Sequence, residues 1–291
     1  MVSLARNSSV ARWRGTHFQE MESLIDIGGD FSAGRTLFSA DAKRLAVGAN
    51  QGRIRVWDLR QRALIREWTN GISPQPFAFL RDGKGLVTVD RGEGVHREWD
   101  LITREATQSW NGVVELYWAC TPAVSPDERW CLTLNWGGAG LIRDLTTGSE
   151  RKLDLNLSQV ASTTFSPDGK LLAAASEFGY ARLWDATTFQ ELPTIRRVLQ
   201  GVHSVAFSPD SKRLAIGSSG IEAIKLWDVE SRQELLTLEG EGSMFFRTAF
   251  SPDGNDLGSM SKAGDLHLWR APSWVEIEEA EAKEKTESKK P

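Results

Sequence analysis

The chain has 291 residues, 40% hydrophobic and 25% charged, a composition that suits a globular protein with a sizeable core. Its 35 basic and 39 acidic side chains give a formal net charge of -4, so no overall positive field favours nucleic acid as a partner. Two cysteines, Cys120 and Cys131, do not suggest a disulfide framework, the apolar runs are too short for a membrane span, and the first residues lack a secretory core. We therefore expect a reducing, cytoplasmic setting, with neither nucleic acid nor a membrane as partner.

One pattern repeats along the whole chain. Seven segments end in an alternating apolar run that closes on tryptophan or its equivalent, at intervals of 44, 42, 44, 41, 43 and 42 residues: Trp13, Trp57, Trp99, Arg143, Trp184, Trp227 and Trp269. A period in the low forties with four short strands per unit is typical of a β-propeller, because one such sheet buries both faces only when neighbours stack against it. The repeat predicts an all-β fold, and it directs the search for function to surfaces.

The first segment has room for only three strands. Residues 1–5 and 10–13 are expected to form the second and third strands of a blade, and residues 23–27 the fourth. A blade without its inner strand leaves backbone groups unpaired unless something covers them. Either the chain is the C-terminal part of a longer protein with seven blades, the first incomplete, or 23–27 pairs beside the strand ending at Trp269 and closes six blades. We favour the seven-blade frame.

The next six segments share a frame of two apolar residues seven positions apart. In the clearest copy, Phe207 is followed by Ser208-Pro209-Asp210, then by Leu214, and the segment closes on Trp227. Ser-Pro-Asp suits a tight turn, so it is expected to join the first two strands, with Phe207 and Leu214 paired across them. The other copies begin at Phe38, Phe79, Val124, Phe165 and Phe250.

With Trp-Asp closing four of these segments, the repeats resemble the WD40 family, and the resemblance covers residues 1–270. It implies a ring-shaped propeller, most often of seven blades, that acts as a binding platform. The family's Gly-His pair and its Asp between the second and third strands are out of place in most segments. No residue of that hydrogen-bonded network is therefore carried over, and packing is expected to hold the blades together.

The repeat ends at Ala271-Pro272. The next four residues, Ser273-Trp274-Val275-Glu276, have the form of a capping box that opens a helix. We expect a WD40 β-propeller over residues 1–271, and a short helix with a charged, disordered tail over 272–291. Residues 266–273 are also similar to the C-terminal end of bacterial multidomain WD40 proteins, some of which carry a protein kinase upstream. That similarity leaves open a role as the sensor or regulatory region of a larger signalling protein.

Catalytic and metal-binding motifs do not stand out. The four histidines fall in different blades without Cys or carboxylate partners at ligand spacing, and no nucleophile motif, phosphate-binding loop or dinucleotide fingerprint occurs. Most aspartates follow Ser-Pro or a closing tryptophan, where a role in the turn explains them. We expect no catalytic, cofactor or metal residue, and a protein that is not an enzyme.

Tryptophan is unusually frequent, with twelve in the chain and six at closing positions. Trp68 and Trp110 align with the end of the outer strand and are expected to pack there. Four extra tryptophans surround the segment that closes on Arg143: Trp110, Trp118, Trp130 and Trp136. They either fill the volume left by the missing closing tryptophan or provide aromatic anchors for a partner, and the sequence leaves both open.

The candidate partner-binding residues follow from where the connections lie. Connections between blades and turns between second and third strands meet on one face, which the family resemblance implies is the face that binds partners. Clustered exposed aromatics anchor interfaces well, because they bury a large area with few rotors to freeze. We expect Trp118, Trp136, Phe178 and Tyr180 to contribute to a protein or peptide site there.

The favoured function is a non-catalytic scaffold or recognition module for a protein or peptide, and the sequence leaves open that the chain is fused to or assembled with upstream domains. The rival is a small-ligand binder or enzyme that uses the central channel. It would draw on inward polar residues of the first strands: Arg35, Thr36, Gln75, Thr163, Thr164, Ser204, Arg247 and Thr248.

Overall fold

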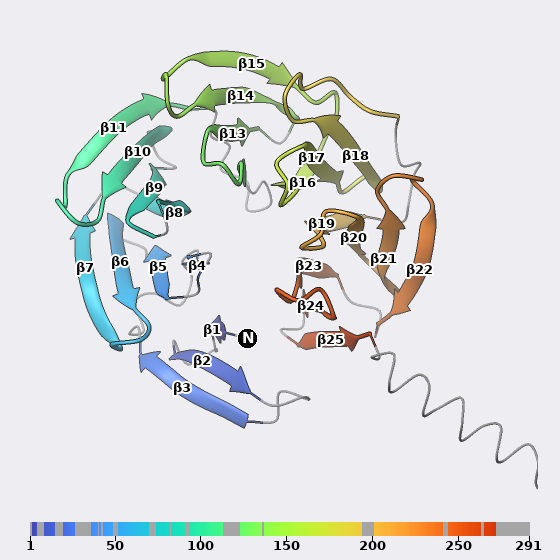
Figure 1. Ribbon diagram of the computed structural model, residues 1–291, viewed down its shortest axis with the longest axis horizontal. Coiled ribbons are helices and arrows are strands. Elements are labelled where there is room, and N and C mark those ends of the chain that lie inside the picture. Colours follow the sequence, from blue (N-terminus) through green and yellow to red (C-terminus); the bar gives the residue numbers. More distant parts are fainter. Residues whose placement is uncertain are drawn as a thin grey trace, which may run out of the picture.

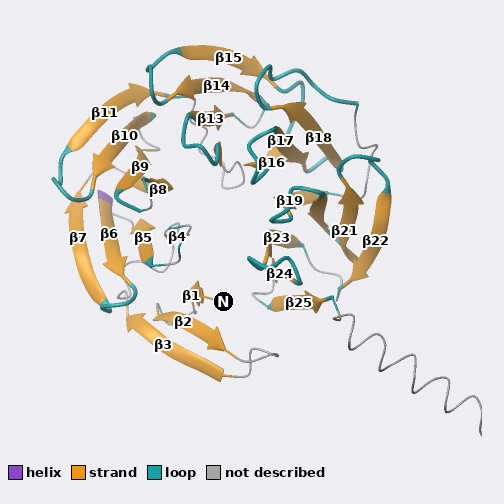
Figure 2. Cartoon of the chain, in the orientation of Figure 1, coloured by secondary structure: helices purple, strands orange, loops and turns teal. Residues whose placement is uncertain are grey.

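The strands form a ring of antiparallel sheets (Figure 1). The computed structural model describes residues 2–4, 9–14, 20–26, 36–39, 41, 43–48, 52–69, 74–81, 83–90, 93–112, 123–135, 137–193, 201–240, 244–262 and 265–271. Within them 25 strands are arranged in seven sheets, and strands make up most of what is coloured in Figure 2. The expected all-β propeller is confirmed.

Each sheet is formed by strands that are consecutive in the chain. The first three sheets are β1 (Val2–Leu4), β2 (Ser9–Arg14) and β3 (Glu20–Asp26); β4 (Thr36–Phe38), β5 (Arg44–Gly48), β6 (Arg53–Asp58) and β7 (Ala63–Thr69); and β8 (Pro74–Leu80), β9 (Gly85–Asp90), β10 (Val95–Asp100) and β11 (Ala106–Asn111). The fourth and fifth sheets are β12 (Ala123–Val124), β13 (Trp130–Leu134), β14 (Ala139–Asp144) and β15 (Glu150–Asp154); and β16 (Val160–Phe165), β17 (Leu171–Ser176) and β18 (Tyr180–Asp185). The last two sheets are β19 (Val202–Phe207), β20 (Arg213–Ser218), β21 (Glu222–Asp228) and β22 (Glu234–Glu239); and β23 (Phe245–Phe250), β24 (Asp256–Ser261) and β25 (Leu266–Arg270).

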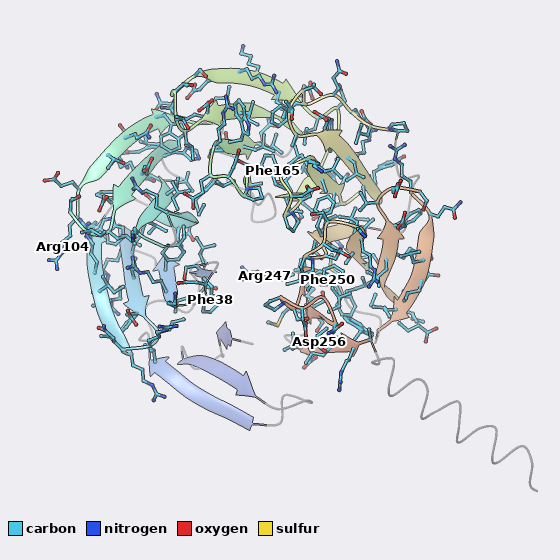
Figure 3. The ribbon with its side chains drawn as sticks, viewed as in Figure 1. Phe38, Arg104, Phe165, Arg247, Phe250 and Asp256 are labelled. Carbon is cyan, nitrogen blue, oxygen red and sulfur yellow. The ribbon has the colours of Figure 1, made fainter. Side chains whose placement is uncertain are left out.

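The apolar frame of the sequence crosses each sheet as one row. Phe207 pairs with Leu214, and Leu214 pairs in turn with Trp227. The same three positions pair in the other sheets that carry the frame, with Val124, Cys131 and Arg143 replacing them in sheet β12–β15. The predicted pairing of Phe207 with Leu214 is confirmed. Figure 3 labels three members of the frame, Phe38, Phe165 and Phe250.

The hydrophobic core lies between neighbouring sheets. Ile54 and Val56 of β6 pack with Leu86 of β9, and Ile224 of β21 packs with the fully buried Phe245 of β23. Each of these clusters takes side chains from two sheets, so one sheet alone leaves its apolar faces in water. The period in the low forties thus corresponds to one sheet, which buries its apolar faces only against neighbouring sheets.

The first sheet contains the three strands that the sequence predicts, β1, β2 and β3. Figure 1 places β1 nearest the ring centre. The six-blade alternative would pair β3 beside β25, whereas the described pairs of β3 are with β2 and those of β25 are with β24. The number of blades in the closed ring stays a prediction, and the helix and tail expected over 272–291 lie outside the described residues.

The Ser-Pro-Asp turns use their carboxylates to fix the backbone. Ser208 donates a hydrogen bond from Oγ to Asp210 Oδ1 at 2.5 Å, and Arg213 N donates to Ser208 Oγ at 2.9 Å. The same Ser-to-Asp bond recurs at four other turns, which begin at Ser39, Ser125, Ser166 and Ser251. The expectation that these aspartates serve the turns is confirmed for the described copies.

Candidate partner-binding face

Backbone hydrogen bonds bring two kinds of connection to the same face of the ring. The first residue of a turn between second and third strands donates its N–H to a carbonyl just before the inner strand of its own sheet. This occurs from Glu177 to Gln159 at 3.0 Å, from Ser219 to Gly201 at 3.1 Å, and from Lys262 to Met244 at 2.8 Å. We call this side the turn face. The Ser-Pro-Asp turns lie at the other ends of the same strands.

Exposed apolar side chains gather on the turn face. Among the described residues, Phe178 is 51% exposed, Tyr180 36%, Ile221 67% and Phe246 43%. They belong to three consecutive sheets, β16–β18, β19–β22 and β23–β25. The other exposed large apolar residues in the described part of the chain lie on outer strands or in the β10–β11 turn: Leu64, Ile102, Leu235 and Leu236.

Phe178 stands on a turn that the backbone holds rigidly. Its own N–H donates to Ser176 Oγ at 3.1 Å, and Gly179 N donates to Ser176 O at 2.9 Å. Gly179 has φ +87°, a conformation that glycine adopts without steric cost. With Glu177 N also bonded to Gln159 O, an exposed aromatic ring is presented at little further cost in backbone entropy.

A buried histidine links the three sheets beneath these side chains. His203, 5% exposed at the start of β19, has Nε2 at 2.7 Å from Ser219 Oγ and Nδ1 at 3.7 Å from Glu177 Oε1. Its ring centroid lies 5.4 Å from that of Phe246. We call Glu177, His203, Ser219 and Phe246 the His203 cluster.

Burial sets the charge state of the cluster. It lowers the pKa of His203 below its ordinary 6.5, and the positive charge of Lys262 lowers it further. Burial also raises the pKa of Glu177 above its ordinary 4.5. At neutral pH the imidazole is therefore uncharged beside the Glu177 carboxylate. Within the described residues, no cation is paired with Glu177, whose side chain is 32% exposed and lies beside the neutral imidazole.

Comparison with known proteins agrees with the geometry. The sequence model of the family described as WD40: WD domain, G-beta repeat, matches residues 148–185 and 194–228, and these two stretches contain β18 and β21 with their closing tryptophans. These two stretches are WD40 repeats. A chain in the crystal structure of the mitotic checkpoint complex superposes with a TM-score of 0.76 over 91% of this chain and 82% of that one, at 18% identity, and shows the WD40 propeller fold alone.

Two relatives indicate how far the similarity extends. Periodic tryptophan protein 2 of Arabidopsis thaliana is 27% identical over 196 residues, which is 64% of this chain and 21% of that protein. An uncharacterized WD repeat-containing protein of Deinococcus radiodurans is 38% identical over 65 residues, 22% of this chain and 24% of that protein. The chain spans between a fifth and a quarter of the length of these WD40 relatives.

Two of the extra tryptophans pack between WD40 blades, as the sequence predicts. Trp68, on the outer strand β7, has its ring centroid 5.4 Å from that of Trp99 in the next sheet. Trp110, on β11, is buried and lies under the guanidinium of Arg143, 4.7 Å away. Arg143 thus takes the place of a closing tryptophan, which supports the packing explanation for Trp110.

The sequence-predicted site residues divide into two groups. The structure places Phe178 and Tyr180 exposed at the β17–β18 turn, on the turn face. Trp118 and Trp136 lie outside the described residues, so their part in the site stays a prediction. Sequence reasoning missed the His203 cluster, because Glu177 and Ser219 look like ordinary turn residues and His203 is one of four histidines without a partner at ligand spacing.

The hydrogen-bonded network of the WD40 family is largely replaced by packing. Trp99 Nε1 donates to Thr88 Oγ1 at 2.9 Å, so one blade retains part of it. The indole nitrogens of Trp57 and Trp227 are buried, and neither has a hydrogen-bond partner in the part of the chain that the structure describes. For these blades the expectation that packing holds the fold is supported.

Two of the polar residues proposed for a channel site, Ser204 and Thr248, serve a contact between sheets. Ser204 Oγ lies 2.7 Å from Thr248 Oγ1 and donates to Phe245 O at 3.1 Å. Thr248 Oγ1 is in turn 3.0 Å from Ser259 Oγ. Arg247 is exposed on the inner strand β23 and points toward the ring centre in Figure 3.

Metal and membrane sites have no described counterpart. Over the described ranges, no three side chains of His, Cys, Asp and Glu gather as metal ligands would. The same part of the chain holds no helix with the length and apolar character to cross a bilayer. The expected absence of a metal or cofactor stays a prediction.

Proposed function

We propose that this WD40 propeller is a non-catalytic recognition module that binds a protein or peptide through its turn face. The observation that carries the proposal is that three consecutive sheets each present one exposed apolar side chain on the turn face, namely Phe178, Ile221 and Phe246. Contiguous exposed apolar side chains on a rigid scaffold are typical of interaction sites, and aromatic residues contribute most to such interfaces.

The proposal extends to the two tryptophans outside the described residues. Trp118 stands six residues before the start of its blade's apolar frame, as Gln159 does in the next blade. Trp136 stands twelve residues after that start, as Glu177 does. Because Gln159 and Glu177 are bonded to each other on the turn face, the repeat favours the same face for Trp118 and Trp136.

A peptide selection tests the proposal. A random dodecapeptide phage library is selected on the wild-type chain, and enriched peptides are measured against Phe178→Ser/Phe246→Ser. We expect at least a tenfold loss of affinity, since two anchors of the patch are removed. Leu235→Ser/Leu236→Ser, exposed on the outer strand β22, is the matched control and should bind as wild type does.

Thermal unfolding accompanies the binding measurement. Both double variants change exposed side chains, so each substitution should shift the free energy of unfolding by no more than about 0.5 kcal/mol. Enriched peptides that bind the Phe178→Ser/Phe246→Ser variant as tightly as wild type would contradict the proposal. A selection that enriches no peptide dependent on the turn face would contradict it as well.

A second candidate function, hydrolysis, is suggested by the order of three side chains in the His203 cluster. Ser219 Oγ, His203 and Glu177 follow the order hydroxyl, imidazole, carboxylate, which activates nucleophiles in hydrolases. The 3.7 Å between Nδ1 and the carboxylate exceeds a hydrogen bond, which favours the non-catalytic function. A fluorophosphonate probe distinguishes them: labelling that disappears in Ser219→Ala would support a hydrolase, and equal background in both proteins would support recognition alone.

A further inference from the structure

We propose that the His203 cluster and the neighbouring Phe178 bind a lysine or arginine side chain of an extended peptide. The inference rests on the proposed function, and it names the chemistry of the partner. The Glu177 carboxylate supplies the opposite charge, and two exposed aromatic rings supply the surface against which the alkyl stem and cationic head of such a side chain pack.

Charge selects the partner class at Glu177. The carboxylate belongs to a partly buried residue, and the group beside it among the described residues is the uncharged imidazole of His203. An ionised carboxylate that has lost part of its hydration gains more from a cation than a fully hydrated one does. The neutral imidazole does not provide that cation, and a basic side chain of a ligand would supply it.

The geometry of the two rings favours the same ligand. Phe178 follows Glu177 directly in the hydrogen-bonded turn. The ring of Phe246 packs against His203, with 5.4 Å between the ring centroids. Aromatic faces attract cations, most strongly where solvent is partly excluded. A carboxylate with exposed rings beside it therefore prefers a basic side chain over a neutral one of equal length.

The charges of Lys262 and Glu177 determine at which end of the site a basic side chain binds. Its positive charge acts on His203 from sheet β23–β25, whereas Glu177 belongs to sheet β16–β18. A basic ligand side chain is therefore repelled at the Lys262 end and attracted at the Glu177 end. The net charge of -4 on the whole chain also favours the approach of a basic peptide.

The buried histidine is the second observation that points to a ligand. His203 is 5% exposed, and its Nδ1 atom faces the carboxylate without a hydrogen-bond partner among the described residues. A buried, unpaired polar atom costs free energy, and such atoms in native proteins call for an explanation. Here Nε2 of the imidazole is hydrogen-bonded to Ser219 Oγ, and the ring is uncharged. The ring therefore does not neutralise Glu177, whose charge is available to a partner.

The test uses peptides enriched by the turn-face selection and compares carboxylate variants. Each peptide is synthesised as selected and with its Lys or Arg changed to Gln, and affinities are measured by fluorescence anisotropy. Glu177→Gln should bind the selected peptides about tenfold more weakly, and the Gln peptides should bind wild type about as weakly. Glu230→Gln is the matched control, because Glu230 is an exposed glutamate on the β21–β22 turn. That turn is hydrogen-bonded to Lys212 and therefore lies on the Ser-Pro-Asp side of the ring, away from the turn face.

The outcomes separate this inference from the proposed function. Peptides sensitive to Phe178→Ser/Phe246→Ser but indifferent to Glu177→Gln and to the loss of their basic residue would overturn the basic-side-chain site and leave peptide recognition standing. A failure to enrich any peptide that depends on the turn face would overturn both. Glu177→Lys gives a further check, since reversal of the charge should turn the selection toward peptides with Asp or Glu.

Discussion

At the scale of single residues, Arg143 shows how a WD40 blade keeps its packing without its closing tryptophan. The guanidinium lies 4.7 Å above the Trp110 ring and its Nη1 is 2.6 Å from Glu150 Oε1. At the previous interface two tryptophans, Trp68 and Trp99, meet instead. A planar cation can replace an aromatic partner because it stacks on the ring face while its nitrogens are bonded at the edge.

Because Arg143 stacks on Trp110, its loss should destabilise the fold more than the loss of Arg182, which forms an ion pair. Arg143→Ala should lower the free energy of unfolding by about 1–2 kcal/mol, since it removes both the stack on Trp110 and the ion pair. Arg182→Ala, at an ion pair 3.2 Å from Glu191, should cost about 0–1 kcal/mol. Urea unfolding measures both, and equal losses would show that the stack on Trp110 contributes nothing.

Glu177 predicts a pH dependence of peptide binding. Because burial raises its pKa, the carboxylate becomes neutral at a higher pH than an ordinary glutamate, and affinity for a basic peptide should fall as pH is lowered through that raised value. His203, which faces Glu177, acts in the same direction: its pKa is lowered, and once it gains a proton its positive charge opposes a basic peptide. Binding to Glu177→Gln should be weak and nearly independent of pH between 4 and roughly 8. The same acid loss in both proteins would assign it to another group.

At the scale of elements, one glycine sets how closely two sheets approach. A Cβ atom at Gly217 of β20 would lie 2.4 Å from Ser204 Oγ and 2.8 Å from Thr248 Oγ1, the pair that joins β19 to β23. Such contacts are far below van der Waals distance, so a side chain at Gly217 would displace the Ser204 and Thr248 hydroxyls and break the contact that joins the two inner strands.

Gly217→Ala should therefore destabilise the fold by about 1–3 kcal/mol. Gly137→Ala is the comparison, because its Cβ would meet only the Asn135 side chain, with the nearest atom at 3.3 Å. Thermal melts of the two variants should differ clearly. Equal melting temperatures would mean that the β20 approach to β23 is easily relaxed.

The sequence predicts elements far better than contacts between them. The frame of Phe207, Leu214 and Trp227 predicts three strands and their register, since each position recurs with the period of the fold. The turn chemistry of Ser208 and Asp210 is equally local, which is why it could be predicted.

The site could be predicted only in part. The repeat indicates which face carries Phe178, because the kind of turn decides it. The meeting of Glu177 with His203 joins two blades through side-chain rotamers and burial, which leave no spacing motif in one sequence. The role of Arg143 is similar: its position in the frame is evident, but its stack on Trp110 appears only when neighbouring sheets are packed.

At the scale of the whole molecule, recurring turn aspartates make stability depend on pH. Backbone N–H groups of Thr103 and Ile102 donate to Asp100 and lower its pKa below the ordinary 3.8, and Ser231 does the same for Asp228. A carboxylate whose folded pKa is lowered stabilises the fold above its ordinary pKa, and this contribution is lost as pH falls through the folded value.

The ring is therefore expected to lose stability below about pH 4, with several equivalent turns acting together. Melting temperatures measured from pH 7 down to roughly pH 2.5 should fall most steeply in that window. Asp100→Asn/Asp228→Asn should lower the melting temperature at pH 7 and flatten the acid limb, because two of the contributing carboxylates are gone. An unchanged acid limb in the double variant would contradict this role.

Hydrogen–deuterium exchange with a selected peptide bound tests the central claim most directly, since it reports where on the ring the partner lies. The turn-face account predicts slower exchange at residues 177–180, 219–222 and 244–247, with β7 and the Ser-Pro-Asp turns unchanged. Protection confined to the Ser-Pro-Asp turns or to the outer strands would contradict recognition through the turn face.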